Sequence, residues 1–165
     1  MQSLTAPPWA RVLLSASRSD APITAPQIHG TSVGFHADGG WLGALMIGKP
    51  GAGKSELALE LIALGAKLVA DDQTCLRREG DAVELSCPIA IRDMIELRGL
   101  GIFRVPSIST ARLTVIIDMD ALETQRFPEP MTIEVHGLRL RYLRNCASRA
   151  FATGLKHYIL SRCWE

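Results

Sequence analysis

One octapeptide carries residues whose types and spacing suit the binding of a phosphorylated ligand. It matches the pattern G-x-x-x-x-G-K-[ST] at every fixed position and reads Gly48-Lys49-Pro50-Gly51-Ala52-Gly53-Lys54-Ser55. Glycines let the backbone wrap tightly, so that successive N–H groups point inward at phosphate oxygens. Lys54 is expected to reach the β- and γ-phosphates of a nucleotide, and the Ser55 hydroxyl is expected to bind Mg²⁺. The pattern therefore predicts a phosphate-binding P-loop.

The flanking residues predict the strand and the helix that such a loop requires. Residues 41–47 form a nearly uninterrupted apolar run, as in a strand buried on both faces of a parallel sheet. Residues 55–64 are rich in strong helix formers, three of their leucines share one helical face, and Gly65 follows where a helix commonly ends. This order places the positive end of a helix dipole at the bound phosphates.

Two candidate acid sites follow apolar strands elsewhere in the chain. A phosphoryl-transfer enzyme needs a carboxylate near the γ-phosphate, to bind Mg²⁺ or to take the proton of the attacking hydroxyl. Asp71 and Asp72 follow a short strand predicted after the helix, whereas Asp118, with Asp120, follows the apolar run 115–117. Both pairs fit a site at the C-terminal ends of strands. We favour Asp71 and Asp72 because their strand is joined directly to the P-loop helix, and interpret Asp118 as a strand end that reaches solvent.

A third segment combines charged residues with glycines and reads Glu96-Leu97-Arg98-Gly99-Leu100-Gly101. Glycines on both sides of Leu100 predict a tightly bent backbone or a close approach to another group. Arg98 can pair with a phosphate or a carboxylate through two hydrogen bonds, and Glu96 can ligate a metal ion. On composition alone, an ordinary loop with a salt bridge is an equal alternative.

Composition limits the class of protein. The chain has 165 residues, 47% of them hydrophobic, and a mean hydropathy of +0.14, which fits one globular domain with a sizeable core. No apolar stretch is long enough to span a bilayer, and no signal peptide is recognised. The net charge of +1 argues against broad binding of nucleic acid. Four scattered cysteines without a C-x-x-C pair argue against zinc and predict reduced thiols in the cytoplasm.

Alternation and turn residues predict the remaining elements. Strands are predicted over 28–35, 67–70, 82–85, 113–118 and 131–142, a loop over 106–111, and a helical tail over 147–162. Residues 1–27 are predicted as a loosely ordered arm with one short element near residues 10–15. The sum is an α/β class domain over 28–165, a P-loop nucleotide-binding domain with a mixed, largely buried sheet.

Four arginines cluster late in the chain, at Arg139, Arg141, Arg144 and Arg149. Two interpretations stay open: a solvated strand edge, or a docking surface for an acidic or phosphorylated partner.

Three blocks in this order resemble the C-terminal catalytic domain of the HPr kinase/phosphorylase family. They are residues 51–62 around the P-loop, residues 68–72 with the aspartate pair, and residues 96–102, which match the family's signature segment almost letter for letter. In addition, Ile28-His29-Gly30 resembles the segment that holds the family's active-site histidine. The resemblance covers about residues 28–105, and the three blocks together are far more specific than the P-loop alone.

The resemblance implies a role for each matching residue. The P-loop would hold ATP, and Ser55 and Glu96 would bind Mg²⁺. Asp72 would be the general base that takes the proton from a serine hydroxyl, and would return it in the reverse reaction. His29 and Asp71 would position or tune that base.

The resemblance also implies a partner and a setting. The chain would be a protein serine kinase for the phosphocarrier protein HPr or a paralogue, in a bacterium where it regulates carbon or nitrogen metabolism. Family members assemble as hexamers, so a homo-oligomer is expected. A P-loop kinase for a small molecule and a non-catalytic nucleotide-binding sensor are the alternatives.

The chain departs from the family pattern in two places. We find no room for the separate N-terminal domain of many members, which predicts a short, catalytic-domain-only form. The loop linked to phosphorolysis of the phosphoserine has no clean counterpart, because residues 144–149 lack its Pro-Gly pair. Arg126 is a candidate replacement for a family active-site arginine. Kinase activity is therefore the firmer expectation.

Overall fold

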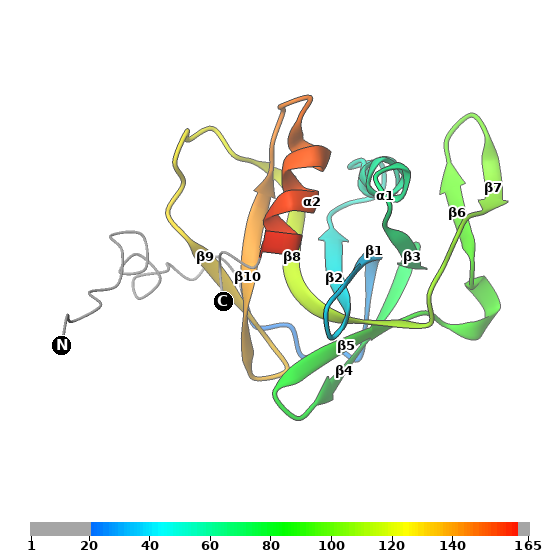
Figure 1. Cartoon of the computed structure of the whole chain (residues 1–165), viewed down its shortest axis with the longest axis horizontal. Coiled ribbons are helices and arrows are strands. Elements are labelled where there is room, and N and C mark those ends of the chain that lie inside the picture. The colour runs from blue at the N-terminus through cyan, green and yellow to red at the C-terminus, as the bar shows by residue number, and fades with distance from the viewer. Residues whose placement is uncertain (1–20, 162–165) are drawn as a thin grey trace.

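The structure, a computed structural model, describes residues 21–161. In this part of the chain a sheet of eight strands is accompanied by a separate two-stranded sheet and two α-helices (Figure 1). The helices are α1 (Lys54–Ala63) and α2 (Phe151–Ser161), and a short 3₁₀ turn covers Ile89–Ile91. The strands are β1 (Gln27–Ala37), β2 (Gly40–Ile47), β3 (Lys67–Ala70), β4 (Gln73–Glu79), β5 (Ala82–Ser86), β6 (Met94–Leu97), β7 (Gly101–Arg104), β8 (Thr110–Leu122), β9 (Met131–Val135) and β10 (Leu138–Asn145).

Strand β2 is the centre of the main sheet and leads into the P-loop. It pairs antiparallel with β1 on one side and parallel with β8 on the other. The parallel register sets Ile47, the last residue of β2, opposite Asp118. The sheet is therefore mixed, as the sequence predicted, and its central strand is buried over Leu42–Met46.

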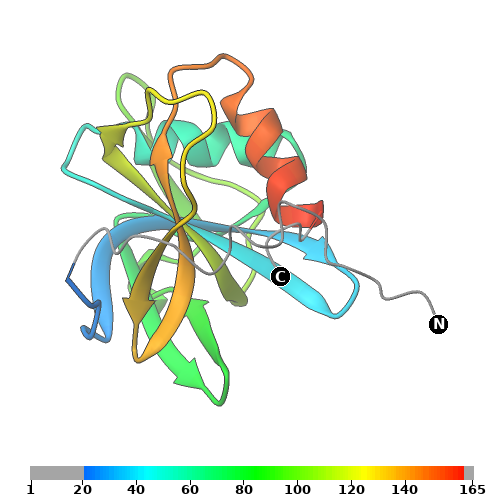
Figure 2. The same cartoon turned by 90° about the vertical axis from the view of Figure 1, so that its left-hand side faces the viewer.

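The β4–β5 hairpin joins the two sides of the sheet. Strand β4 pairs with the start of β1, β5 pairs with the start of β8, and β8 pairs with β2 again, so the pairings form a closed circuit. Beyond β8 the sheet continues through β10 to β9, and β3 adds to β1. Figure 2 shows the hairpins of β4–β5 and β9–β10 curling below the central strands. Closure reduces the length of open edge that the sheet exposes.

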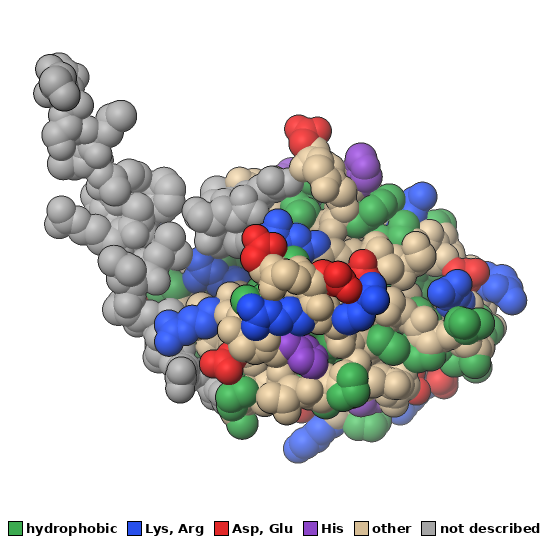
Figure 3. All heavy atoms as spheres, turned by 90° about the horizontal axis from the view of Figure 1, so that it is seen from below, with side chains coloured by type: hydrophobic (Ala, Val, Ile, Leu, Met, Phe, Trp, Pro, Cys, Tyr) green, Lys and Arg blue, Asp and Glu red, His purple; other side chains and the backbone are tan. Residues whose placement is uncertain are grey.

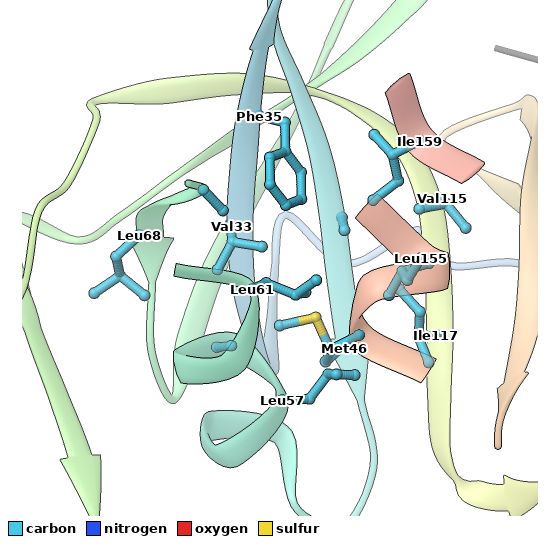
Figure 4. Packing of buried hydrophobic residues seen from close by; sticks show 14 of the residues in the cluster. Val33, Phe35, Met46, Leu57, Leu61, Leu68, Val115, Ile117, Leu155 and Ile159 are labelled. Carbon is cyan, nitrogen blue, oxygen red and sulfur yellow. The ribbon is translucent and has the colours of Figure 1, made fainter. Parts of the chain in front are cut away.

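Two apolar clusters fill the two faces of this sheet. One lies under α1 and α2, where Leu57 and Leu61 of α1 meet Met46 and Val33 of the sheet (Figure 4). The other lies on the opposite face, where Leu45 and Ile116 contact residues of β4, β5, β9 and β10. Thr114 is skipped in the β2–β8 register and donates to the Gly43 carbonyl at 2.8 Å. This bulge shifts the alternation of β8 by one residue, so that Val115 and Ile117 face the helices while Leu113 and Ile116 face the opposite side.

Helix α1 follows the predicted boundaries closely. It begins at Lys54 and ends at Ala63, and Gly65 has a φ of 103°, in the left-handed region that glycine adopts without strain. The Ala66 N–H donates to the Leu61 carbonyl and the Gly65 N–H to the Ile62 carbonyl, which is the Schellman pattern of a helix end.

The other predicted elements are largely confirmed. Strands occur at every predicted range, and the range 131–142 is divided into β9 and β10 by a turn at His136–Gly137. The predicted helical tail begins at Phe151 rather than at residue 147. The loop expected over 106–111 ends earlier, because β8 starts at Thr110.

The segment 21–26 differs from the loosely ordered arm predicted over 1–27. Ile23 forms a parallel bridge with Val135, and the Pro26 carbonyl accepts from the Leu76 N–H at 2.8 Å. These residues therefore lie along β9 and β4. The short element predicted near residues 10–15 lies outside the described residues, as do residues 162–165.

Charges of both signs are mixed on the face shown in Figure 3. There, basic and acidic side chains lie among one another. The strand β10, which carries Arg139, Arg141 and Arg144, is not an edge, because it lies between β8 and β9. Within residues 21–161, neither helix has the length and apolar character needed to cross a bilayer.

Replacing Leu61 by alanine tests whether the packing of α1 stabilises the domain. Leu61 has no exposed surface and lies between the sheet and α1, so Leu61→Ala should lower the free energy of unfolding by about 2–5 kcal/mol. Leu100→Ala is the matched control, because Leu100 is 73% exposed and should change stability by less than about 0.5 kcal/mol. Urea unfolding monitored by circular dichroism measures both. Equal losses would contradict the assigned core.

Candidate functional site

The candidate site lies where β2 and β3 end beside the N-terminus of α1 (Figure 1). A pocket there is lined by residues from the P-loop, the aspartate pair, β1 and the β6–β7 hairpin. Its lining residues are His29, Thr31, Pro50, Gly51, Gly53, Lys54, Ser55, Glu56, Asp71, Asp72, Glu96, Leu97 and Arg98. Segments far apart in the sequence therefore converge on one concave surface.

The P-loop adopts a wrapped conformation that depends on glycine. Gly48 has a φ of 145° and Gly53 a φ of 93°, values that side chains with a Cβ rarely adopt. The Lys54 ammonium donates to the Gly48 carbonyl at 2.8 Å and to the Lys49 carbonyl at 2.9 Å. Lys54 is buried, and its charge therefore lies inside the loop rather than in solvent.

The N-terminus of α1 suits an anion. The first N–H groups of a helix have no partner within the helix, and no side chain of the described residues caps α1. The N–H groups of Lys54 and Ser55 are therefore available to phosphate oxygens, beside the Lys54 charge. This arrangement fits the triphosphate of a nucleotide, which the motif predicts.

Asp71 is the central acceptor of the site. It is buried, and its Oδ1 accepts from the Thr31 and Ser55 hydroxyls, both at 2.8 Å. Its Oδ2 accepts from the Glu96 N–H at 3.0 Å. One carboxylate thus joins β1, α1 and β6. Its contact with Ser55 places a carboxylate next to the predicted Mg²⁺-binding hydroxyl.

Asp72 differs from its neighbour in exposure and in backbone geometry. Its side chain is 68% exposed and lies 3.0 Å from Nδ1 of His29. Its φ of 67° is in the left-handed region, which is uncommon for residues other than glycine. The Asp72 carbonyl accepts from the Gly30 N–H at 3.0 Å, which fixes the strained residue to β1. Such backbone strain often accompanies functional residues.

The segment 96–101 forms the end of the β6–β7 hairpin. Gly99 and Gly101 have φ values of 93° and 84°, so the predicted tight bend is present. Glu96 and Arg98 line the pocket, whereas Leu100 lies outside it and is largely exposed. The hairpin is attached to the core by Ile95, which is buried under α1.

Most of the site residues predicted from sequence lie together in this pocket. The structure brings together His29, Lys54, Ser55, Asp71, Asp72, Glu96 and Arg98. Arg126 does not lie among the residues that line it. Its guanidinium carbon is 5.3 Å from the ring centre of Phe127, in an exposed loop after β8. The loop residues Gly48, Lys49 and Ala52 support the P-loop without lining the pocket.

Sequence reasoning missed Thr31 and Glu56, which also line the pocket. Alternation along β1 could have indicated Thr31, because it lies two residues after His29 and therefore on the same face of the strand. Thr31 is fully buried. Ser32 and Thr74 are also fully buried, and the hydroxyls of these two residues lie 3.1 Å apart.

Asp118 is not the solvent-exposed strand end that the sequence suggested. Strand β8 continues to Leu122, Asp118 is half-buried, and its Oδ2 accepts a short hydrogen bond from the Tyr142 hydroxyl. Neither Asp118 nor Asp120 lines the pocket. The structure therefore separates the two candidate acid sites.

The cysteines of the described residues are free thiols. Burial raises the pKa of Cys87 to about 11, with a further contribution from nearby Cys75, so Cys87 stays a neutral thiol at physiological pH. Within residues 21–161, no three His, Cys, Asp or Glu side chains form a ready-made metal site. Mg²⁺ in nucleotide enzymes is usually bound through one or two carboxylates together with substrate phosphates and water.

The described residues form an α/β domain with a mixed sheet, and comparisons with known proteins specify its family. Residues 24–134 match the model of the HPr Serine kinase C-terminal domain. The chain is 37% identical over 128 residues to the HPr kinase/phosphorylase of Bacillus pumilus, covering 73% of this chain and 39% of that protein. It is 40% identical over 108 residues to the corresponding protein of Bacillus cytotoxicus, covering 61% and 33%. The chain belongs to the HPr serine kinase C-terminal domain family.

A solved structure supports the fold. The Hpr(Ser) kinase/phosphatase from Coxiella burnetii superposes with a TM-score of 0.67 at 22% identity, covering 80% of this chain and 95% of that one. At this identity the likeness concerns the fold. The chain spans 39% of the length of the Bacillus pumilus relative, so only part of that protein is matched.

Replacing Thr31 by valine tests whether Asp71 depends on its buried donors. Valine keeps the shape of threonine but removes the hydroxyl that donates to Asp71 at 2.8 Å. Hydrogen bonds to charged groups contribute about 1.5–3 kcal/mol, so Thr31→Val should lower the free energy of unfolding by that amount. Thr31→Ser keeps the donor and should lose clearly less. Urea titration measures the free energy of unfolding of both variants. A serine variant as unstable as the valine variant would refute the role of the hydroxyl.

Proposed function

We propose that this chain is the catalytic part of an ATP- and Mg²⁺-dependent protein serine kinase that phosphorylates HPr or a paralogue. The observation that carries the proposal is the exposed Asp72, paired with His29 in the same pocket as the P-loop and Lys54. A phosphate-binding loop alone would fit many proteins. A carboxylate at the mouth of that loop adds a group that can accept a proton from an incoming hydroxyl.

The nucleotide would be held by the P-loop and the start of α1. The N–H groups of Lys54 and Ser55 and the Lys54 ammonium would surround the terminal phosphates, which is the main requirement of phosphoryl transfer. Ser55 and Glu96 are the proposed Mg²⁺ ligands, with Asp71 orienting Ser55 through its 2.8 Å hydrogen bond. When bound, the metal ion would neutralise charge on the phosphates.

The proposed transfer needs few groups from the protein. The serine oxygen bonds to the γ-phosphorus as the bond to the leaving ADP breaks, and Asp72 takes the proton of the serine hydroxyl. The 3.0 Å contact with His29 would hold the Asp72 carboxylate in the orientation needed. In the phosphorolysis direction, an oxygen of inorganic phosphate would bond to the phosphorus of the phosphoserine as the bond to the serine oxygen breaks. Pyrophosphate would leave, and Asp72 would pass the proton of the attacking phosphate to the serine oxygen.

The exposure of Asp72 favours a protein acceptor over a small molecule. Its side chain is 68% exposed, and a serine on the surface of another protein can reach it without entering a closed cavity. A small-molecule kinase usually encloses its acceptor to exclude water. A homo-oligomer in the cytoplasm of a bacterium is the setting that the family resemblance implies.

The first experiment is phosphate transfer from γ-labelled ATP with Mg²⁺ to a purified HPr protein from the same organism. The control acceptor has its candidate serine changed to alanine. Label on the serine protein and none on the alanine protein would establish the kinase, and added inorganic phosphate would then test the reverse direction. Binding of ATP without transfer would instead support the small-molecule kinase or the sensor.

Replacing Asp72 by asparagine tests the general base. General-base catalysis contributes about 10²–10⁴-fold, so Asp72→Asn should lower the transfer rate by that factor while ATP affinity changes by less than about threefold. Asp81→Asn, in the exposed β4–β5 turn, is the matched control and should keep the wild-type rate. Single-turnover transfer and equilibrium dialysis give the two quantities. A wild-type rate in Asp72→Asn would remove Asp72 from the mechanism.

A further inference from the structure

The second acidic pair, Asp118 and Asp120, has no role in the proposed reaction, and yet Asp120 contacts the P-loop. Both residues lie outside the pocket that contains Asp71 and Asp72. Asp120 instead accepts from the Lys49 N–H with both carboxylate oxygens, at 3.1 and 3.0 Å. The P-loop is therefore held from two sides, by Asp71 at Ser55 and by Asp120 at Lys49.

Strand β8 is irregular at the point where it meets the loop. In the ladder with β10, Arg144 pairs with Asp118 and the next residue, Asn145, pairs with Leu122. Residues 119–121 therefore bulge out of the ladder. Bulges turn side chains in new directions and are common beside active sites. Here the bulge turns Asp120 toward the first residues of the P-loop.

The bulge packs closely on Gly48. A Cβ built on Gly48 would lie 3.2 Å from the Cβ of Met119 and 3.3 Å from Oδ1 of Asp120. A larger residue would have to displace the bulge. The close approach and the φ of 145° together explain a glycine at this position.

A chain of hydrogen bonds fixes the orientation of Asp120. The Tyr142 hydroxyl, on a side chain that is 2% exposed, donates to Oδ2 of Asp118. Oδ1 of Asp118 accepts from the Asp120 N–H at 2.9 Å. The buried tyrosine of β10 is thus connected through β8 to the P-loop backbone.

Lys49 transmits this constraint to the residues that would hold phosphate. Its carbonyl accepts from the Ala52 N–H at 3.1 Å and from the Lys54 ammonium at 2.9 Å. Its N–H is bound by Asp120. Any rotation of Lys49 would therefore move the Lys54 ammonium and the turn of the loop together.

We infer that Asp120 is a positioning residue for nucleotide binding, oriented by Asp118 and Tyr142, which holds the P-loop in its binding conformation through Lys49. This inference rests on the proposed ATP binding. Asp120 acts through the geometry of the backbone, not through its charge, because a negative charge beside the loop would by itself repel phosphate.

The test compares two substitutions that separate geometry from charge. Asp120→Ala removes the acceptor for the Lys49 N–H, and should raise the Kd for ATP about tenfold, because the P-loop loses the contact that holds it in the binding conformation. Asp120→Asn removes the charge but keeps an acceptor oxygen, and should bind ATP within about threefold of the wild type. Asp81→Ala, in the exposed β4–β5 turn, is the matched control. Equilibrium dialysis with labelled ATP measures binding without turnover.

The outcomes distinguish this inference from the proposed function. A wild-type chain that does not bind ATP would contradict the proposed function. A wild-type chain that binds ATP equally well as Asp120→Ala would overturn the inference alone, as would tighter binding by Asp120→Asn, which would show that charge repulsion dominates. Asp120 is exposed, so both variants are expected to fold, and circular dichroism checks this. If the alanine variant is unfolded, the Kd of Asp120→Asn is compared with that of the wild type.

A double substitution tests the route from Tyr142. Tyr142→Phe removes the donor to Asp118, and should weaken ATP binding less than Asp120→Ala does. If both act through one chain of contacts, Tyr142→Phe combined with Asp120→Ala should bind ATP no more weakly than Asp120→Ala alone. Effects that multiply in the double variant would show that Tyr142 acts by another route and would refute its place in the chain.

Discussion

The buried carboxylate of Asp71 is the interaction on which the rest of the site depends. A buried charge is costly unless it is hydrogen-bonded, and Asp71 accepts from Thr31, Ser55 and the Glu96 N–H. These donors come from β1, from the start of α1 and from β6. The need to satisfy one carboxylate therefore fixes three elements relative to each other, and with them the pocket.

The adjacent aspartates divide two tasks between them. Asp71 is buried and accepts three hydrogen bonds, whereas Asp72 takes a left-handed backbone conformation and turns its side chain outward beside His29. The left-handed conformation of Asp72 at the strand end directs the two side chains apart, so adjacent aspartates can serve structure and chemistry at once. In the proposed reaction the exposed member would meet the acceptor serine, whereas the buried member keeps the P-loop and the β6–β7 hairpin in place.

Local patterns in the sequence predicted the parts of the site that are local in the chain. The P-loop, α1 and the bend at Gly99 and Gly101 each depend on a few consecutive residues, and each is found where the pattern places it. The closed circuit through the β4–β5 hairpin and the role of Asp120 depend on residues distant in the chain. Sequence periodicity carries no information on which strands pair, so it could not assign Asp118 to a buried tyrosine.

Rigid support on both sides of the P-loop follows from the mixed sheet. Strand β2 has β1 and β3 on one side, which bring the aspartate pair, and β8 on the other, which brings its bulge. A loop of this kind gains binding strength when its donors already point at the ligand, because less ordering is needed on binding. Asp71 holds the helix end of the loop through the Ser55 hydroxyl, and Asp120 holds the beginning of the loop through the Lys49 N–H. Between these two anchors the loop's own carbonyls hold the Lys54 ammonium, which in the proposed function would exchange them for phosphate oxygens.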